Sequence, residues 1–153
     1  MRPQGYGQVM ILGIGTDLTS ISRIDDTLQK YGARFIARCF GSDESAKVEK
    51  SAQGAPHLRA AGYAKRWAAK EACAKALGLG IRNDIYLKDI AVSSNPDGQP
   101  QLVLSGGAKD RLTAMTPKGM TARLDVSLTD EMPGEKTGAG MALAFVVISA
   151  EVA

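Results

Sequence analysis

Histidine and cysteine are scarce in this sequence, which has one histidine, His57, and two cysteines, Cys39 and Cys73. A zinc site takes several cysteine or histidine ligands, and no cysteine or second histidine lies near His57 in the chain. Ser-His-Asp catalysis needs a histidine together with a recognisable nucleophile motif, and the sequence has no such motif. We therefore expect neither zinc-dependent nor histidine-based chemistry, and we interpret His57 as a surface residue at a helix start.

Long apolar segments are also missing. The longest stretch, Met141 to Ile148, is far shorter than the roughly 20 residues of a membrane-spanning helix. Met1 to Gln8 lacks the apolar region and the cleavage site of a secretory signal. We expect a cytoplasmic protein without a membrane span. In such a protein Cys39 and Cys73 are expected to stay reduced and to pack as small hydrophobic groups rather than to pair as a disulfide.

Glycine-based phosphate fingerprints are incomplete. Gly13 and Gly15 follow an apolar run, but Leu18 stands where a dinucleotide-binding motif needs its third glycine. The segment 134–137 resembles the end of a P-loop, yet its lysine does not follow the glycine directly. We interpret both matches as chance.

The composition that remains is typical of one globular domain. Of 153 residues, 44% are hydrophobic, 23% are charged and only 5% are aromatic, which favours a core of aliphatic residues and alanine. We predict a single domain over residues 1–153, with residues 1–8 as a flexible N-terminal extension. The net charge of +3 is too small to indicate nucleic-acid binding. One segment is nevertheless rich in basic residues. We interpret it either as a solvated helix face or as a site for a phosphate-rich ligand. Its basic residues are Arg59, Lys65, Arg66, Lys70 and Lys75.

Hydrophobic periodicity predicts an α+β fold with a largely antiparallel sheet packed against a long helix. The first strand ends just before Asp17, and Thr19 or Ser20 can cap the helix that follows. The turn signal at 95–98 indicates a hairpin. The last two strands are expected to pair with each other. The expected strands are 9–14, 89–94, 101–105, 123–129 and 141–149.

The longest predicted helix runs from about Pro56 to Leu77 and carries both packing and polar residues. Trp67, Glu71 and Lys75 recur every four residues, so they share one stripe of the helix. A neighbouring stripe of alanines allows close packing: Ala61, Ala64, Ala68 and Ala72. Glu71 and Lys75 by themselves are explained by an exposed helix ion pair, which contributes only about 0.2 to 0.5 kcal/mol.

Asp17 and Glu71 become informative when they are considered together. A carboxylate directly after an apolar strand is costly to bury without a partner, although helix capping or a turn explains Asp17 alone. Two carboxylates beside a basic helix are what a divalent ion and a phosphate ligand need, because magnesium takes oxygen ligands and completes its shell with phosphate and water.

Two segments carry a family resemblance. Ile11 to Leu18 (ILGIGTDL), followed by Arg23 and Ile24, resembles the N-terminal motif of the holo-acyl-carrier-protein synthases. Lys65 to Ile81 (KRWAAKEACAKALGLGI) is similar to the signature helix of the 4'-phosphopantetheinyl transferase superfamily. The resemblance extends over about residues 9–149 and implies the fold of that superfamily. It also implies transfer of 4'-phosphopantetheine from coenzyme A to a serine of apo acyl carrier protein, which releases 3',5'-ADP and supports fatty acid biosynthesis.

The resemblance also assigns roles to individual residues. It implies Asp17 and Glu71 as ligands of Mg²⁺, and Lys75 as a contact to the phosphates of coenzyme A. Arg66 and the turn from Gly78 to Gly80 match positions near coenzyme A. Acidic carrier protein is expected to dock on the first helix through Arg23 and Arg34. Members of the family are trimers with active sites between subunits, so a homotrimer is expected as well.

One position departs from part of the family. Some members have Ser-Leu-Ser-His where this chain has the segment 127–130, so Asp130 stands in place of a proposed active-site histidine. Asp130, Glu71 or a water on the metal remain as the group that accepts the serine proton. The loop 133–140 also looks longer than usual. Two other hypotheses are a non-catalytic module that binds coenzyme A or nucleotide, and a structural homo-oligomer assembled through the alanine-rich helix.

Overall fold

A computed structural model describes residues 8–152, so the predicted N-terminal extension at 1–8 lies almost wholly outside the described residues. Helices and strands follow the order expected from the periodicity. The elements are β1 (Val9–Ser20), α1 (Ile21–Cys39), α2 (Ser42–Ala52), α3 (Pro56–Ala76), a short 3₁₀ helix η1 (Leu87–Asp89), β2 (Ile90–Ser94), β3 (Pro100–Leu104), α4 (Gly106–Met115), β4 (Met120–Glu131) and β5 (Met141–Val152).

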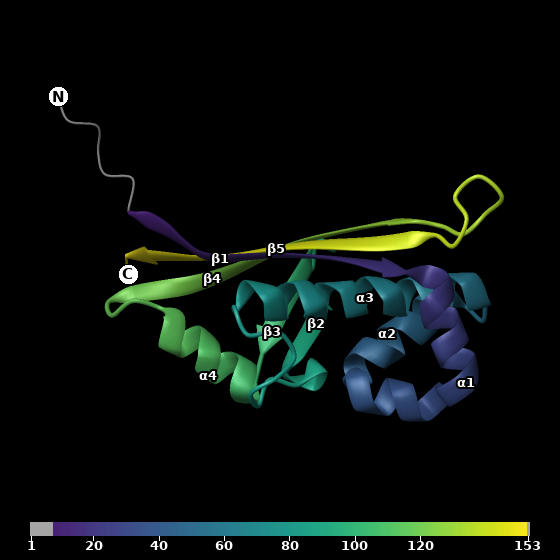
Figure 1. The fold of residues 1–153 in the computed structure, drawn as a ribbon, viewed down its shortest axis with the longest axis horizontal. Coiled ribbons are helices and arrows are strands. Elements are labelled where there is room, and N and C mark those ends of the chain that lie inside the picture. The colour runs from purple at the N-terminus through teal and green to yellow at the C-terminus, as the bar shows by residue number, and fades with distance from the viewer. Residues whose placement is uncertain (1–7, 153) are drawn as a thin grey trace.

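The strands form two antiparallel sheets. A three-stranded sheet has the order β1-β5-β4, and β2 pairs with β3 in a separate hairpin. The helix α3 runs along one face of the three-stranded sheet, and the other helices and the hairpin lie on that same side (Figure 1). The predicted α+β class, the hairpin and the pairing of the last two strands are confirmed. Among the described residues, no helix covers the opposite face of the three-stranded sheet (Figure 1).

Two glycines allow β1 to lie close against α3. A Cβ on Gly13 would lie 2.0 Å from the carbonyl oxygen of Ala76, and one on Gly15 would lie 1.9 Å from that of Ala72. No side chain fits at either position because the obstacle is helix backbone. The glycines that imitate a nucleotide fingerprint are therefore packing residues. Asp17 follows them on the same face of the strand, since side chains alternate with a period of two, and is thus directed toward α3.

The strand that carries Asp17 is longer than the sequence indicated. β1 continues to Ser20, because its last residues pair with β5 as far as Ser20 opposite Met141. The prediction that Asp17 follows the end of the strand is therefore wrong: the residue lies within it. Ser20 caps α1 by accepting a hydrogen bond from the backbone N–H of Arg23, as one of the two predicted caps.

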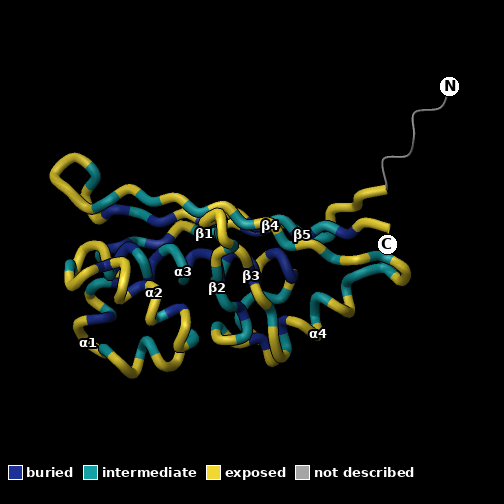
Figure 2. The backbone as a smooth tube through the Cα atoms, turned by 180° about the vertical axis from the view of Figure 1, so that it is seen from behind, coloured by how far each residue is buried: buried dark blue, intermediate teal, exposed yellow. Residues whose placement is uncertain are grey.

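Two hydrophobic cores lie on the helical side of the sheet. One joins the sheet-facing part of α3 to β5 and the hairpin, and the other joins α1, α2 and the first half of α3. Buried residues are concentrated along α3 and at alternate positions of β5, on the face of the sheet that packs against α3 (Figure 2). Cys39 and Cys73 are free thiols in these cores, as predicted, and burial raises the pKa of both. Within residues 8–152, no helix combines the length and the apolar character that a bilayer crossing requires.

The crowded basic residues do not share one surface. Lys70 is fully buried and forms an ion pair with Glu44 at 2.8 Å. Arg59 forms an ion pair with Glu49 at 2.9 Å. The interpretation of the whole set as a solvated helix face is therefore wrong for Lys70, which is unavailable to a phosphate ligand as well.

Candidate active site

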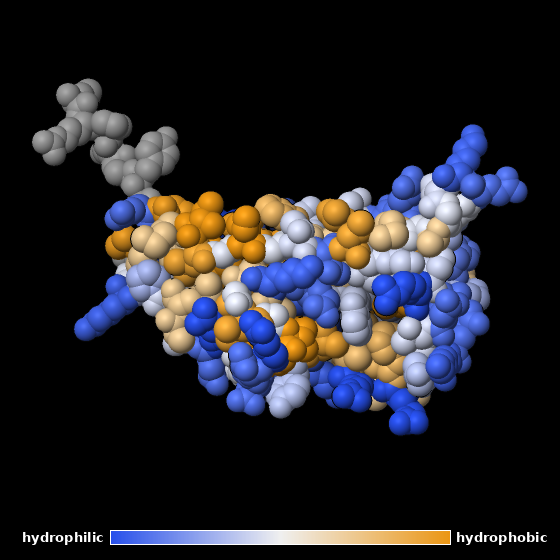
Figure 3. All heavy atoms as spheres, in the orientation of Figure 1, coloured by the Kyte–Doolittle hydropathy of each residue, from blue (hydrophilic) through white to orange (hydrophobic). Residues whose placement is uncertain are grey.

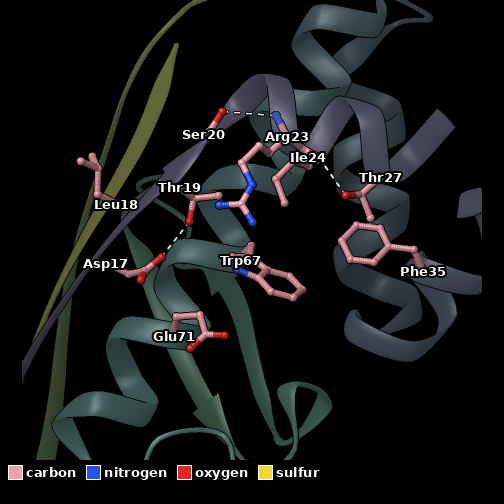
Figure 4. A pocket seen from close by; sticks show the side chains of 10 residues that line it. All are labelled: Asp17, Leu18, Thr19, Ser20, Arg23, Ile24, Thr27, Phe35, Trp67 and Glu71. Atoms are coloured by element: carbon pink, nitrogen blue, oxygen red, sulfur yellow. Dashed lines mark hydrogen bonds between the residues drawn. The ribbon is translucent and has the colours of Figure 1, made fainter. Parts of the chain in front are cut away.

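Asp17 and Glu71 line one pocket of about 430 Å³ at the junction of β1, α1 and α3. Figure 4 shows both carboxylates on the same side of β1, whereas Leu18 points away from them on the opposite face of the strand. The sequence brings them together because Gly13 and Gly15 let the strand approach the helix. The pocket is lined by Asp17, Leu18, Thr19, Ser20, Arg23, Ile24, Thr27, Phe35, Trp67 and Glu71.

Both oxygens of the Asp17 carboxylate are hydrogen-bonded. Thr19 Oγ1 donates to Oδ2 at 2.7 Å, and Lys75 Nζ donates to Oδ1 at 2.9 Å. Lys75 also donates to the backbone carbonyl of Thr16 at 2.8 Å. The Asp17 side chain is only 17% exposed, so these donors replace most of the water that would otherwise solvate its charge.

Glu71 lies beside this cluster on α3. Burial raises the pKa of its carboxyl group, the negative charge of Asp17 raises it further, and Lys75 opposes both effects. Within residues 8–152, Lys75 forms its ion pair with Asp17 and not with Glu71, the partner expected from their spacing on the helix. Two carboxylates thus line one pocket, and the ion pair of Lys75 is with Asp17, so Glu71 is the carboxylate that a further cation would stabilise.

Aromatic and basic side chains form the rest of the pocket wall. The rings of Trp67 and Phe35 lie 5.6 Å apart, and they give the pocket an apolar part of its wall. The guanidinium group of Arg23 points from α1 into the pocket (Figure 4). A second pocket of about 310 Å³ continues along α1 and includes Arg34, and it shares Thr27 and Phe35 with the first.

The donor set suits a magnesium ion bound together with a phosphate ligand. Across the described part of the chain, no three or more histidine, cysteine, aspartate or glutamate side chains are grouped to hold a metal by themselves. Magnesium commonly uses one or two protein carboxylates and takes its remaining oxygens from phosphate and water. Asp17 and Glu71 supply two such carboxylates at one pocket, so the residues present fit the expected ion.

Other predicted site residues lie outside this pocket. Asp130 on β4 forms an ion pair with Lys65 at 3.0 Å and does not line the Asp17–Glu71 pocket. Arg66 donates from Nη1 to the carbonyl oxygen of Gly62 at 3.3 Å, and its buried Nε has no hydrogen-bond partner within the described residues. Gly78 and Gly80 have positive φ of 80° and 68° at the end of α3, a conformation that favours glycine.

Thr19 contacts Asp17 directly, whereas its place in the sequence suggests only a helix cap. The signal was present, because Thr19 is two residues from Asp17 and so shares its face of any strand that includes both. Glu44, the partner of Lys70, was missed as well. It lies 26 residues from Lys70 along the chain, and no periodicity connects the two positions.

The fold and the pocket together define a class of protein: an α+β domain in which a sheet strand and a long helix each contribute one carboxylate to a phosphate-compatible site. The family model described as "4'-phosphopantetheinyl transferase superfamily" matches residues 13–127. This chain belongs to that superfamily.

Curated relatives are similar over nearly the whole chain. The holo-[acyl-carrier-protein] synthase of Rhodopseudomonas palustris (strain TIE-1) is 53% identical over 141 residues, which are 92% of this chain and 91% of the relative. That of Bradyrhizobium diazoefficiens is 48% identical, again over 92% of this chain, and over 96% of the relative.

Solved structures confirm the expected fold. The holo-[acyl-carrier-protein] synthase from Neisseria meningitidis superposes with a TM-score of 0.69 at 34% identity, covering 91% of this chain and 98% of that one. The Helicobacter pylori enzyme, solved in complex with coenzyme A, gives a TM-score of 0.66 at 27% identity, covering 88% and 98%.

Proposed function

We propose that this chain is a holo-[acyl-carrier-protein] synthase that transfers 4'-phosphopantetheine from coenzyme A to a serine of apo acyl carrier protein. The products are holo acyl carrier protein and 3',5'-ADP. The observation that carries the proposal is the pairing of Asp17 and Glu71 at one pocket beside Lys75, in a chain of the phosphopantetheinyl transferase superfamily. The coenzyme A complex of the Helicobacter pylori relative supports coenzyme A as the donor.

Asp17 and Glu71 are the residues that would hold Mg²⁺. When bound, the ion supplies charge neutralisation for the pyrophosphate of coenzyme A. Asp17 brings a carboxylate that accepts hydrogen bonds at both oxygens, and Glu71 brings one whose raised pKa reflects its burial and the charge of Asp17. We include the ion in the proposed mechanism because the two neighbouring carboxylates, Asp17 and Glu71, are stabilised by a positive charge.

The chain's own residues then bind the donor and manage the proton. The side chain of Lys75 is 52% exposed, so it can leave Asp17 and contact a coenzyme A phosphate, where its charge stabilises the departing 3',5'-ADP. Glu71 is the proposed acceptor of the serine proton, because it lines the pocket. Asp130 stays an alternative acceptor, one that would first have to release Lys65. Arg66, Gly78 and Gly80 are assigned to coenzyme A binding by the family resemblance alone.

The proposed carrier-protein site is the exposed side of α1. Arg23 and Arg34 lie on adjoining pockets of this helix, and Arg23 also reaches the Asp17–Glu71 pocket. An acidic carrier that contacts both arginines would bring its serine close to the carboxylates. The loop between β4 and β5 supports the start of α1, since Ala139 and Gly140 accept hydrogen bonds from the N–H groups of Ser22 and Ile21.

A homotrimer is proposed as the working assembly. The uncovered face of the three-stranded sheet exposes large apolar side chains, and apolar side chains gather on the sheet side of the molecule (Figure 3). Contiguous apolar surface of this kind marks interaction sites. The large apolar side chains exposed on this face are Ile14 at 61%, Leu18 at 59%, and Leu143 and Phe145 at 40% each.

We further propose that the chain acts as a single domain in the cytoplasm and serves fatty acid biosynthesis.

The direct test is to incubate the protein with apo acyl carrier protein, coenzyme A and Mg²⁺, and to measure the carrier by mass spectrometry. We expect the carrier to gain one phosphopantetheine group, and Asp17→Ala and Glu71→Ala to prevent the gain. A carrier whose acceptor serine is replaced by alanine is the control. Binding of coenzyme A without transfer would favour a non-catalytic module instead.

A further inference from the structure

Thr19 is a buried polar side chain at the pocket that the proposed mechanism leaves without a role of its own. It lies on the same face of β1 as Asp17, is 8% exposed and lines the same pocket. Its hydroxyl group donates to Asp17 Oδ2 at 2.7 Å (Figure 4). The direction of this bond is fixed, because an ionised carboxylate can only accept hydrogen bonds.

The two donors to Asp17 differ in rigidity. Lys75, which donates to Oδ1, has a long side chain that is half exposed. Thr19 is β-branched and buried, so its χ1 angle is restricted both by its own structure and by its neighbours. The contact of Thr19 therefore fixes the carboxylate plane, whereas the contact of Lys75 is the one free to exchange.

We propose that Thr19 is a positioning residue, which holds Asp17 Oδ2 so that Oδ1 is presented to a cation: Lys75 in this structure and a divalent ion during transfer. The inference rests on the proposed function. Without the hydroxyl group, the carboxylate would have to be ordered when the ion binds. Hydrogen bonds that orient metal ligands typically change metal affinity by about 10- to 100-fold.

The test uses Trp67, the one tryptophan of the sequence, which lines the same pocket. Mg²⁺ is titrated into the protein with coenzyme A and without carrier protein, and tryptophan fluorescence is recorded. Thr19→Val is expected to move the midpoint to about 10- to 100-fold higher Mg²⁺. Thr19→Ser keeps the hydroxyl group and should restore the midpoint to within a few fold. Thr121→Val, an exposed change on β4, is the matched control.

Steady-state transfer gives a second measurement that a merely structural role would not move. The Thr19→Val variant should need more Mg²⁺ for half-maximal rate and approach the wild-type kcat at saturating Mg²⁺, with an unchanged KM for the carrier. Its thermal unfolding midpoint is measured alongside. If the valine variant does not fold, Thr19→Ala replaces it in both titrations.

The outcomes separate this inference from the proposed function. If wild-type protein transfers phosphopantetheine and Thr19→Val shares its Mg²⁺ dependence, the positioning role is wrong and the proposed function stands. Failure of Thr19→Ser to restore the midpoint would also overturn the inference, because the hydroxyl group would then not be the cause. A wild-type protein that responds to Mg²⁺ in neither measurement would overturn both.

Discussion

Two lysines of α3, five residues apart, have opposite environments. Lys70 is fully buried, and its ammonium group donates to Glu44 and to the backbone carbonyls of Leu87 and Ile90. Lys75 is 52% exposed and donates to Asp17 and to one carbonyl. Both form ion pairs, with N–O distances of 2.8 and 2.9 Å. Distance alone therefore does not distinguish the buried pair from the pair at the candidate site.

The number of fixed partners and the access of water make the difference. Burial lowers the pKa of Lys70, and the negative charge of Glu44 opposes this effect. Glu44 is itself fixed, since it accepts from the backbone N–H groups of Gly41 and Val92. The pair thus joins α2, α3 and the start of β2, and neither charge can leave without a large desolvation cost. Lys75 remains solvated, so exchanging its partner costs little.

Breaking the buried pair should give the largest effect. Glu44→Ala leaves Lys70 buried without its counter-ion, and we expect the free energy of unfolding to fall by about 3 to 5 kcal/mol. Urea unfolding followed by circular dichroism measures the change. Asp125→Ala removes an exposed ion pair with Arg123 and is the control, with no expected change in midpoint. Equal midpoints for Glu44→Ala and wild type would mean that the buried pair does not stabilise the fold.

The double variant Lys70→Met and Glu44→Leu sharpens the same comparison. Replacing a buried ion pair by apolar side chains is often neutral or stabilising, because both desolvation costs disappear. We expect it to recover most of the stability that Glu44→Ala loses. Transfer activity should follow the folded fraction in both variants, since neither residue lines the Asp17–Glu71 pocket.

Changing the pair of Asp17 and Lys75 should affect transfer more than folding, because the lysine of this pair is half exposed. Asp17→Asn keeps the size of the side chain and removes its charge, and we expect kcat/KM to fall by at least about 100-fold because a proposed metal ligand is lost. The urea midpoint should fall much less than for Glu44→Ala, because the ammonium group of Lys75 is 52% exposed and water can solvate it once the charge of Asp17 is gone. Transfer at the wild-type rate would remove Asp17 from the mechanism.

A smaller loss is expected for the other partner. Lys75→Met removes one charged hydrogen-bond donor at the phosphates, and we expect a decrease in kcat/KM of about 10- to 100-fold. The decrease should appear in KM for coenzyme A as well as in kcat, and Lys75→Arg should recover part of it. Lys47→Met on α2 is a control with the same charge change. An effect on KM for the carrier alone would contradict the assigned contact to coenzyme A.

The smallest expected effect concerns the buried side of α3 between the two lysines. Burial raises the pKa of the Cys73 thiol from 9.0 to about 12. Above pH 9 the unfolded chain loses this proton and the folded chain keeps it, so the free energy of unfolding should fall as pH rises toward 12. The slope for one such group is about 1.4 kcal/mol per pH unit. Urea unfolding at pH 9 to 10.5 measures it, and Cys73→Ala should reduce the slope without removing it, because burial also raises the pKa of Cys39 and of Tyr63. An unchanged slope would count against the Cys73 thiol as a source of the dependence.

Much of the architecture followed from periodicity. The alternation in 123–129, the turn at 95–98 and the alanine stripe each predicted an element that the structure contains. The end of β1 was predicted wrongly because residues up to Ser20 are held in the strand by pairing with β5, far along the chain. Such pairing overrides the local turn and cap signals that suggested an earlier end.

The candidate site was predicted chiefly from the two family motifs, and Asp17 and Glu71 do share a pocket. The partner of Lys75 could not be predicted from spacing, because the helix offered Glu71 at the favoured separation while the neighbouring strand offered Asp17. The closeness of that strand depends on Gly13 and Gly15, whose role becomes visible only against the backbone of α3.

The sequence by itself determined that α3 carries two lysines on different faces, since five residues advance a helix by about 140°. It also determined the two motifs that identify the superfamily. Only the tertiary structure decided which lysine is buried, because the choice depends on what packs against each face. Glu44 and the start of β2 enclose Lys70, whereas the glycine-bearing strand brings Asp17 to Lys75 and leaves that ammonium group in contact with water.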